Sequence, residues 1–226
     1  MEKRRFVTRV LALMLLVTSF RVNGQSDTLS FLHITDTHLI FDLEQFHPEI
    51  VSRRKHYGFG HKPLMNLLDS VSRSKDLRFV ALTGDMIDFH GGTTSQGIFK
   101  YYQIEQFSRL IGQYPVTVFL NPGNHDVATY AWGGDKMLSS QRYAGKARAA
   151  WIQSAAAFRE GTYYSRTLQV GKRQYRLIFL DNGYNSAGEL EKSKPPYLDR
   201  VQLEWLKEQL NESKEDTEIV LMHIPL

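Results

Sequence analysis

Short apolar runs alternate with amphipathic stretches along the chain. Four of these runs have the length and composition of buried strands, and they lie at residues 31–35, 79–83, 116–120 and 219–222. Apolar residues at helical spacing follow the first two runs, from Pro63 onward and again over residues 98–111. This alternation of strand, helix and strand predicts parallel strands that are joined by right-handed crossovers.

The second half of the chain predicts a further sheet. Residues 163–170 and 175–181 have the pattern of an antiparallel hairpin, with a glycine in the short turn between them. An alanine-rich helix is predicted over residues 143–158. A last helix is predicted to begin after Asp199, because an aspartate favours the position that caps a helix N-terminus.

Three polar segments carry no clear periodicity and are predicted to be loops. They cover residues 40–60, 90–97 and 182–196, and the first is expected to border the ends of the strands. His90 is predicted to be exposed to solvent. His33 lies inside the first strand, where a lone histidine is more often a packed core residue than a ligand.

Polar side chains follow each of the four apolar runs. These side chains are Asp36 and His38; Asp85 and Asp88; Asn124, His125 and Asp126; and His223. In an open α/β sheet, ligands bind beyond the carboxyl ends of the strands. Carboxylate, amide and imidazole groups can bind metal ions or move protons. The order of the motifs, each at the exit of a strand, therefore predicts a chemical site at this edge of the sheet.

The composition is that of an ordinary globular domain, and it restricts the kinds of metal site. The chain has 226 residues, of which 42% are hydrophobic and 23% charged. It contains no cysteine, so any metal must be held by nitrogen and oxygen ligands. The net charge of +4 comes from the first 24 residues, and without them basic and acidic side chains are equal in number. The charge therefore gives no support for nucleic-acid binding.

The N-terminus has the form of a secretory signal peptide. A basic start precedes an apolar run over residues 10–20, and Val22 and Gly24 stand at the positions favoured by signal peptidase. The run is too short to span a bilayer, which needs about 20 residues. We expect residues 1–24 to be removed, which leaves a secreted or periplasmic chain, residues 25–226, without a transmembrane segment.

The polar motifs resemble those of the calcineurin-like metallophosphoesterase superfamily over residues 29–226. The family pattern is Asp-x-His, Gly-Asp-x-x-Asp, Gly-Asn-His-Asp/Glu, a lone His and then Gly-His-x-His, and the first four motifs are present. The fifth is absent, because the sequence stops at Leu226. The resemblance implies an α/β fold, a four-layer α/β/β/α sandwich of two mixed sheets, here incomplete at its C-terminus.

The resemblance also implies a role for each polar residue. One metal would be held by Asp36, His38 and Asp85, and the second by Asp85, Asn124 and His223. The ions would be divalent, or an Fe(III)/divalent pair, drawn from Fe, Zn and Mn, and a water bridging them would be the nucleophile. His125 would act near the leaving group, Asp126 would orient its ring, and Asp88 would order the metal-binding groups.

Two interpretations of the activity follow. The first is a hydrolase of small-molecule phosphoric esters. The second is a truncated or degenerate, catalytically inactive metal-binding member of the same fold. Without the closing motif each metal is one histidine short, so we expect weak metal retention and little turnover from these 226 residues. Motifs of serine hydrolases, P-loop enzymes and dinucleotide-binding proteins are absent from the sequence. The sequence does not indicate an oligomeric state.

Overall fold

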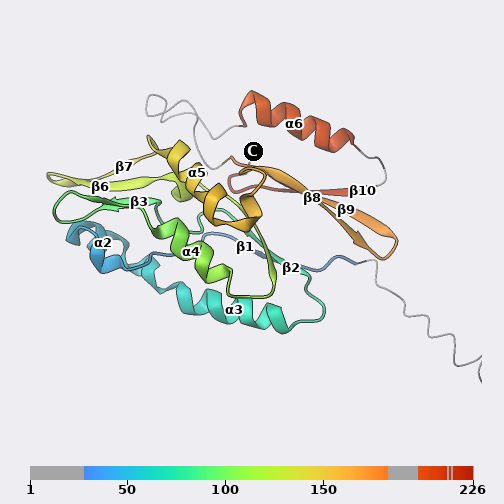
Figure 1. The fold of residues 1–226 in the computed structure, drawn as a ribbon, viewed down its shortest axis with the longest axis horizontal. Helices are drawn as coiled ribbons and strands as arrows, with labels where there is room; N and C mark the ends of the chain where they lie inside the picture. The colour runs from blue at the N-terminus through green and yellow to red at the C-terminus, as the bar shows by residue number, and fades with distance from the viewer. Residues whose placement is uncertain (1–27, 183–197, 213, 215, 226) are drawn as a thin grey trace, which may run out of the picture.

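The computed structural model describes residues 28–182, 198–212, 214 and 216–225 (Figure 1). The predicted signal peptide lies outside the described residues, and so does nearly all of the loop predicted at residues 182–196. No helix in the described ranges is both long enough and apolar enough to cross a membrane.

The first sheet contains three parallel strands in the order β1 (Leu32–Ile34), β2 (Phe79–Thr83) and β5 (Thr117–Asn121). Their apolar side chains were the basis of the prediction, and all five residues of β2 are buried. Because the strands are parallel, the loops that follow them leave the sheet at the same edge. The predicted arrangement of the first three strands is confirmed.

Three helices pack against the first sheet or beside it. They are α3 (His61–Arg73), α4 (Gln103–Ile111) and α5 (Ala144–Ser154), the last followed by the short 3-10 helix η4 (Ala156–Phe158). Helix α3 begins two residues before Pro63, which therefore lies in the first turn and not at the first position. The ring of Trp151 in α5 is fully buried and lies 5.7 Å from the ring of Phe107 in α4.

The second sheet contains the predicted hairpin. Strands β8 (Tyr164–Val170) and β9 (Arg173–Phe179) are antiparallel, and β10 (Asp216–Leu221) runs parallel to β9. The two sheets face each other, with the rings of Phe119 and Phe179 5.4 Å apart.

Helix α6 (Arg200–Asn211) covers the outer face of the second sheet. It begins as predicted, because the Asp199 side chain accepts a hydrogen bond from the backbone N–H of Gln202. Figure 1 shows the layers in the order α6, second sheet, first sheet, then α3 and α4. This is the mixed α/β sandwich that the motifs implied.

A third, small sheet was not predicted. It has the order β4 (Phe99–Lys100), β3 (Gly91–Thr93), β6 (Thr129–Gly133) and β7 (Lys136–Ser140). Strand β3 falls in a glycine-rich stretch that the sequence predicted as a loop. A side chain at Gly92 would come within 2.9 Å of the Phe46 ring, so glycine here permits close packing of a buried strand.

Residues 40–60 are folded into short helices and are not the loop that was predicted. They form the 3-10 helix η1 (Leu43–Gln45), α2 (Pro48–Arg54) and the 3-10 helix η2 (Lys55–Phe59). Phe46 and Ile50 from this segment pack with Phe89 and Tyr130 in a second hydrophobic cluster. The segment is thereby fixed against the small sheet.

Two histidines differ from their predicted environments. His90 is only 2% exposed, and burial lowers its pKa to about 4, so the ring is neutral at pH 7. His33 is exposed, although its Nε2 lies 2.6 Å from the Thr83 hydroxyl. Strand β1 is the edge strand of the first sheet among the described residues.

Tyr164 joins the two sheets through the backbone at the edge of β5. Its hydroxyl donates to the carbonyl oxygen of Leu120 at 2.8 Å and accepts from the N–H of the same residue at 3.0 Å.

We expect Tyr164→Phe to leave both backbone groups buried without partners, which lowers the free energy of unfolding by about 1–3 kcal/mol. Urea unfolding would measure this loss. In the control, Tyr163→Phe, we expect a change below about 0.5 kcal/mol, and equal effects in the two variants would contradict this role of Tyr164.

Candidate metal centre

The loops after four strands bring most of the predicted residues together. Asp36 and His38 follow β1, and Asp85 and Asp88 follow β2. His125 and Asp126 begin the 3-10 helix η3 (His125–Val127), which follows β5. His223 lies two residues beyond β10, in the other sheet. The site thus draws on both sheets.

The backbone around the site adopts a conformation that side chains disfavour. Asp36, His38 and Asp85 have φ values of 57°, 44° and 48°, and they are three of the four non-glycine residues with positive φ in the described ranges. Such residues are uncommon and cluster at functional sites. The His38 N–H donates to the Asp85 carbonyl oxygen at 2.8 Å, so the two strained turns are joined directly.

Two glycines of the motifs allow the side chains to approach. Gly84 has φ 84°, and a side chain there would clash with the ring of His223. A side chain at Gly123 would clash with the carboxylate and backbone nitrogen of Asp85. These two positions therefore require glycine because of what lies against them.

The nitrogen and oxygen atoms form two groups that share Asp85. One group is His38, Asp85 and His125, and the other is Asp36, Asp85 and His223, with the potential ligand atoms of each group within 4.8 Å of one another. The Nε2 atoms of His223, His38 and His125 lie 3.3, 3.6 and 4.0 Å from Asp85 Oδ2. Mixed imidazole and carboxylate donors suit Fe, Zn and Mn, so the residues fit the ions that the motifs imply.

In the centre the pKa values of two histidines are raised and that of Asp85 is lowered, so the charged forms of these groups are favoured. Burial lowers the pKa of His223, but the hydrogen bond and the charge of Asp85 outweigh this and raise it to about 9. Burial likewise raises the pKa of Asp85, yet the interactions with His223 and His125 lower it overall. The pKa of His38 is raised, since Asp88 and Asp85 outweigh the effect of its burial. Metal binding to His38 and His223 would therefore displace protons from these two imidazoles.

Asp88 contacts two histidines of the site. Its Oδ1 lies 3.1 Å from His38 Nδ1, and its backbone oxygen lies 2.8 Å from His125 Nδ1. The Tyr130 hydroxyl lies 3.1 Å from the same nitrogen of His125. Arg54 in α2 binds both carboxylate oxygens of Asp88. Burial raises the pKa of Asp88, but the contacts with Arg54 and His38 outweigh this and lower it.

Asp126 has a different environment from the one predicted. It is fully buried, and its carboxylate accepts hydrogen bonds from the backbone N–H groups of Ile87 and Gly123 at 3.0 and 2.7 Å. The contacts to the His125 ring nitrogen come instead from Asp88 and Tyr130. Asn124 directly precedes η3, and its backbone oxygen accepts a hydrogen bond from the Gln141 side chain.

Arg54 and Tyr130 are the site residues that sequence reasoning missed. Arg54 lies in the segment predicted as a loop, where Pro48 was a usable signal because proline favours the first helical position. Nothing in the sequence pairs Arg54 with Asp88, which lies 34 residues away.

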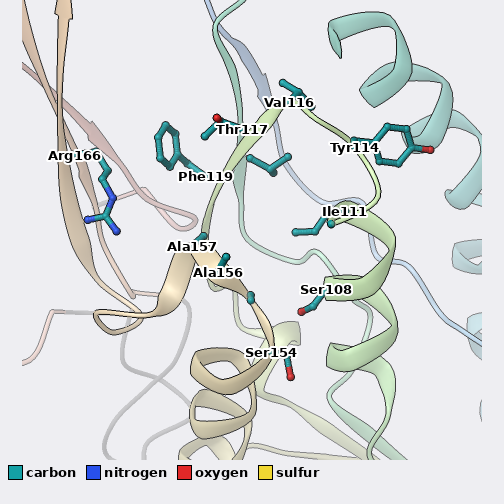
Figure 2. Close-up of a pocket in the computed structure, with 13 residues that line it drawn as sticks. Ser108, Ile111, Tyr114, Val116, Thr117, Phe119, Ser154, Ala156, Ala157 and Arg166 are labelled. Carbon is teal, nitrogen blue, oxygen red and sulfur yellow. The ribbon is translucent and has the colours of Figure 1, made fainter.

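A cavity of about 420 Å³ lies away from these residues, between α4, β5, η4 and β8 (Figure 2). Its walls include Ser108, Phe119, Ala156 and Arg166, and none of the predicted site residues lines it. The cavity is therefore separate from the candidate metal centre.

Comparison with known proteins agrees with the motifs. The calcineurin-like phosphoesterase family matches residues 29–226, so the chain belongs to this family. Among solved structures, the NAD nucleotidase NadN of Haemophilus influenzae is similar, with 13% identity and a TM-score of 0.45. The match covers 86% of this chain and 34% of the nucleotidase, so the chain spans about a third of that protein. A search of curated proteins gave no match.

The close approach at Gly123 leads to a test of the site geometry. We expect Gly123→Ala to displace the Asp85 carboxylate, lower stability by about 1–3 kcal/mol and weaken metal binding. Gly145→Ala is the matched control, because a side chain there meets nothing within 4 Å and alanine favours the helix. Thermal unfolding and metal titration would measure both effects. Unchanged metal affinity in Gly123→Ala would show that the approach to Asp85 is not needed.

Proposed function

We propose that this protein hydrolyses phosphoric esters at a dinuclear metal centre. The observation that carries the proposal is that two groups of metal-binding atoms converge on one buried carboxylate, that of Asp85. A shared carboxylate is suited to bridge two ions, and the family to which the chain belongs supports metal-dependent phosphoester chemistry.

The residues of the centre would divide between two ions. By the motifs, Asp36, His38 and Asp85 would hold one, and Asp85, Asn124 and His223 the other. The neighbouring atoms in the structure group differently, with Asp36 beside His223 and His38 beside His125. Two metal ions held there would acidify a water for attack and neutralise charge on the phosphoryl oxygens. The donor set favours Fe, Zn or Mn.

His125 is suited to proton transfer. Its Nδ1 can donate to the backbone oxygen of Asp88, which lies 2.8 Å away. That hydrogen bond leaves Nε2 as the atom that carries a proton to the leaving oxygen. His125 Nε2 lies 4.0 Å from Asp85 Oδ2, so it faces the shared carboxylate. The substrate would be a small-molecule phosphoester.

In a form of the protein that also carries the closing Gly-His-x-His motif, two substitutions should separate metal binding from chemistry. We expect Asp85→Ala to weaken both metals and abolish activity, because it removes the shared ligand. His125→Ala should retain metal, while turnover falls by roughly 10²–10⁴-fold, the range for lost acid–base assistance. Metal content and hydrolysis of an aryl phosphate mono- and diester would be measured on the same samples.

Asp69→Ala serves as the control for this experiment, since Asp69 is an exposed helix residue that pairs only with Arg73 in the described structure. If His125→Ala loses metal as fully as Asp85→Ala, then His125 is a ligand and its proposed role is wrong. If the unaltered protein binds metal but hydrolyses neither ester, the protein is an inactive metal-binding member of the family.

We also propose that the protein is exported. The support is the basic start, the apolar run at residues 10–20 and the Val22/Gly24 spacing in the sequence. Protein recovered from outside the cytoplasm should begin after Gly24, as measured by mass spectrometry. Exported protein that still begins at Met1 would refute removal of the segment.

A further inference from the structure

Arg54 is held rigidly at the C-terminal end of α2. Its side chain is 15% exposed, and its Cζ lies 4.4 Å from the ring centroid of Tyr57 and 5.2 Å from that of Tyr130. Contacts with two aromatic rings favour a guanidinium over other cations, because its planar group stacks on them. The side chain of Arg54 is thus confined by the rings of Tyr57 and Tyr130.

The Arg54 guanidinium binds the Asp88 carboxylate through two parallel hydrogen bonds. Nε donates to Asp88 Oδ2 at 2.7 Å, and Nη2 donates to Oδ1. Asp88 has no exposed surface. A single hydrogen bond would leave the carboxylate free to turn about its last torsion, which is broad. The paired contact fixes its plane.

The fixed carboxylate contacts His38 directly. Asp88 Oδ1 lies 3.1 Å from His38 Nδ1, while His38 Nε2 lies 3.5 Å from Asp36 Oδ1 and 3.6 Å from Asp85 Oδ2. A proton on Nδ1 satisfies the contact with Asp88 and leaves Nε2 to face the two other carboxylates. The Nδ1–H tautomer is therefore the one that offers a nitrogen lone pair to a metal.

The orientation of His125 depends less on the Asp88 carboxylate than that of His38 does. Its Nδ1 lies 2.8 Å from the backbone oxygen of Asp88 and 3.5 Å from the carboxylate oxygen Oδ1. The backbone oxygen is held by the loop after β2, whatever the plane of the carboxylate. His125 is thus an internal reference for effects that pass through the Asp88 carboxylate, while a change in His125 would report the separate route through Tyr130, which lies beside both Arg54 and the His125 ring.

We propose that Arg54 is a positioning residue of the metal centre, which fixes the Asp88 carboxylate and so keeps His38 in the Nδ1–H tautomer with Nε2 toward Asp36 and Asp85. This role rests on the proposed function only in assigning His38 to a metal. The tautomer itself is a property of the metal-free protein and can be measured without substrate.

The test compares three variants of the whole chain. Arg54→Met removes the guanidinium and keeps an apolar stem, and Arg54→Lys keeps the charge but not the paired hydrogen bonds. Arg53→Met is the matched control, because Arg53 is the exposed neighbour in α2 and lies over Trp132. Long-range ¹H–¹⁵N spectra of the metal-free proteins at alkaline pH, where the imidazoles are neutral, report the tautomer of each ring.

In Arg54→Met we expect His38 to become a mixture of tautomers while His125 stays in the Nδ1–H form. Affinity for Co²⁺, measured by titration, should fall by roughly 10–100-fold, the usual effect of losing a group that orients a ligand. Arg54→Lys should show a smaller change in both readouts, and Arg53→Met none. A purely structural role would lower the unfolding temperature without changing the tautomer.

Two results would overturn the proposal. The first is an unaltered His38 tautomer and Co²⁺ affinity in a folded Arg54→Met protein. The second result applies if Arg54→Met does not fold. It is an unaltered His38 tautomer in Arg54→Lys. Absence of hydrolysis by the unaltered protein would refute the proposed function, but the dependence of the His38 tautomer on Arg54 would still stand or fall by these spectra.

Discussion

The rest of the structure depends on the convergence of both sheets on the Asp85 carboxylate. His38 and His125 reach it from loops of the first sheet, and His223 reaches it from beyond β10 in the second. The second sheet can supply His223 only while it stays packed against the first. The Nδ1 atom of His223 lies 2.9 Å from the carbonyl oxygen of Thr83, the last residue of β2, so the packing of the sheets and the geometry of the site are one constraint.

This convergence is unfavourable by itself, and the surrounding fold offsets it. Asp85 has a left-handed backbone and a buried charge, each of which costs free energy without compensation. Interactions with His223 and His125 stabilise the charge, as the lowered pKa of Asp85 shows. The raised pKa of His223 reflects the same interaction, because the hydrogen bond and charge of Asp85 favour the protonated ring. Metal and proton therefore compete for the same atoms, and binding of one requires release of the other.

The elements that were predicted correctly from the sequence are those that depend on residues close together in the chain. Strand β2 is apolar up to its last residue, Thr83, and a glycine follows it, so both its position and the chemistry at its exit follow from neighbouring residues. Strand β3 and Arg54 were missed because their causes are tertiary. Gly92 lies in a strand because the Phe46 and Phe89 rings pack against its backbone, and Arg54 matters because Asp88 lies beside it in space. His90 was placed in solvent because it begins a polar, glycine-rich stretch, and no local signal indicates that its ring lies 5.1 Å from that of Tyr101 and is buried.

The environments of Asp126 and Asp88 show the same limit at the level of single contacts. Adjacency in the sequence made Asp126 the expected partner of the His125 ring. In the 3-10 turn that these residues begin, the carboxylate of Asp126 faces inward to the N–H groups of Ile87 and Gly123. It thereby joins the loop after β5 to the loop after β2, while Asp88 contacts the His38 ring in the loop after β1 and the His125 ring in the loop after β5. One aspartate holds the backbone of the site and the other holds its imidazoles, so the two carboxylates are not interchangeable although both stand in the motifs.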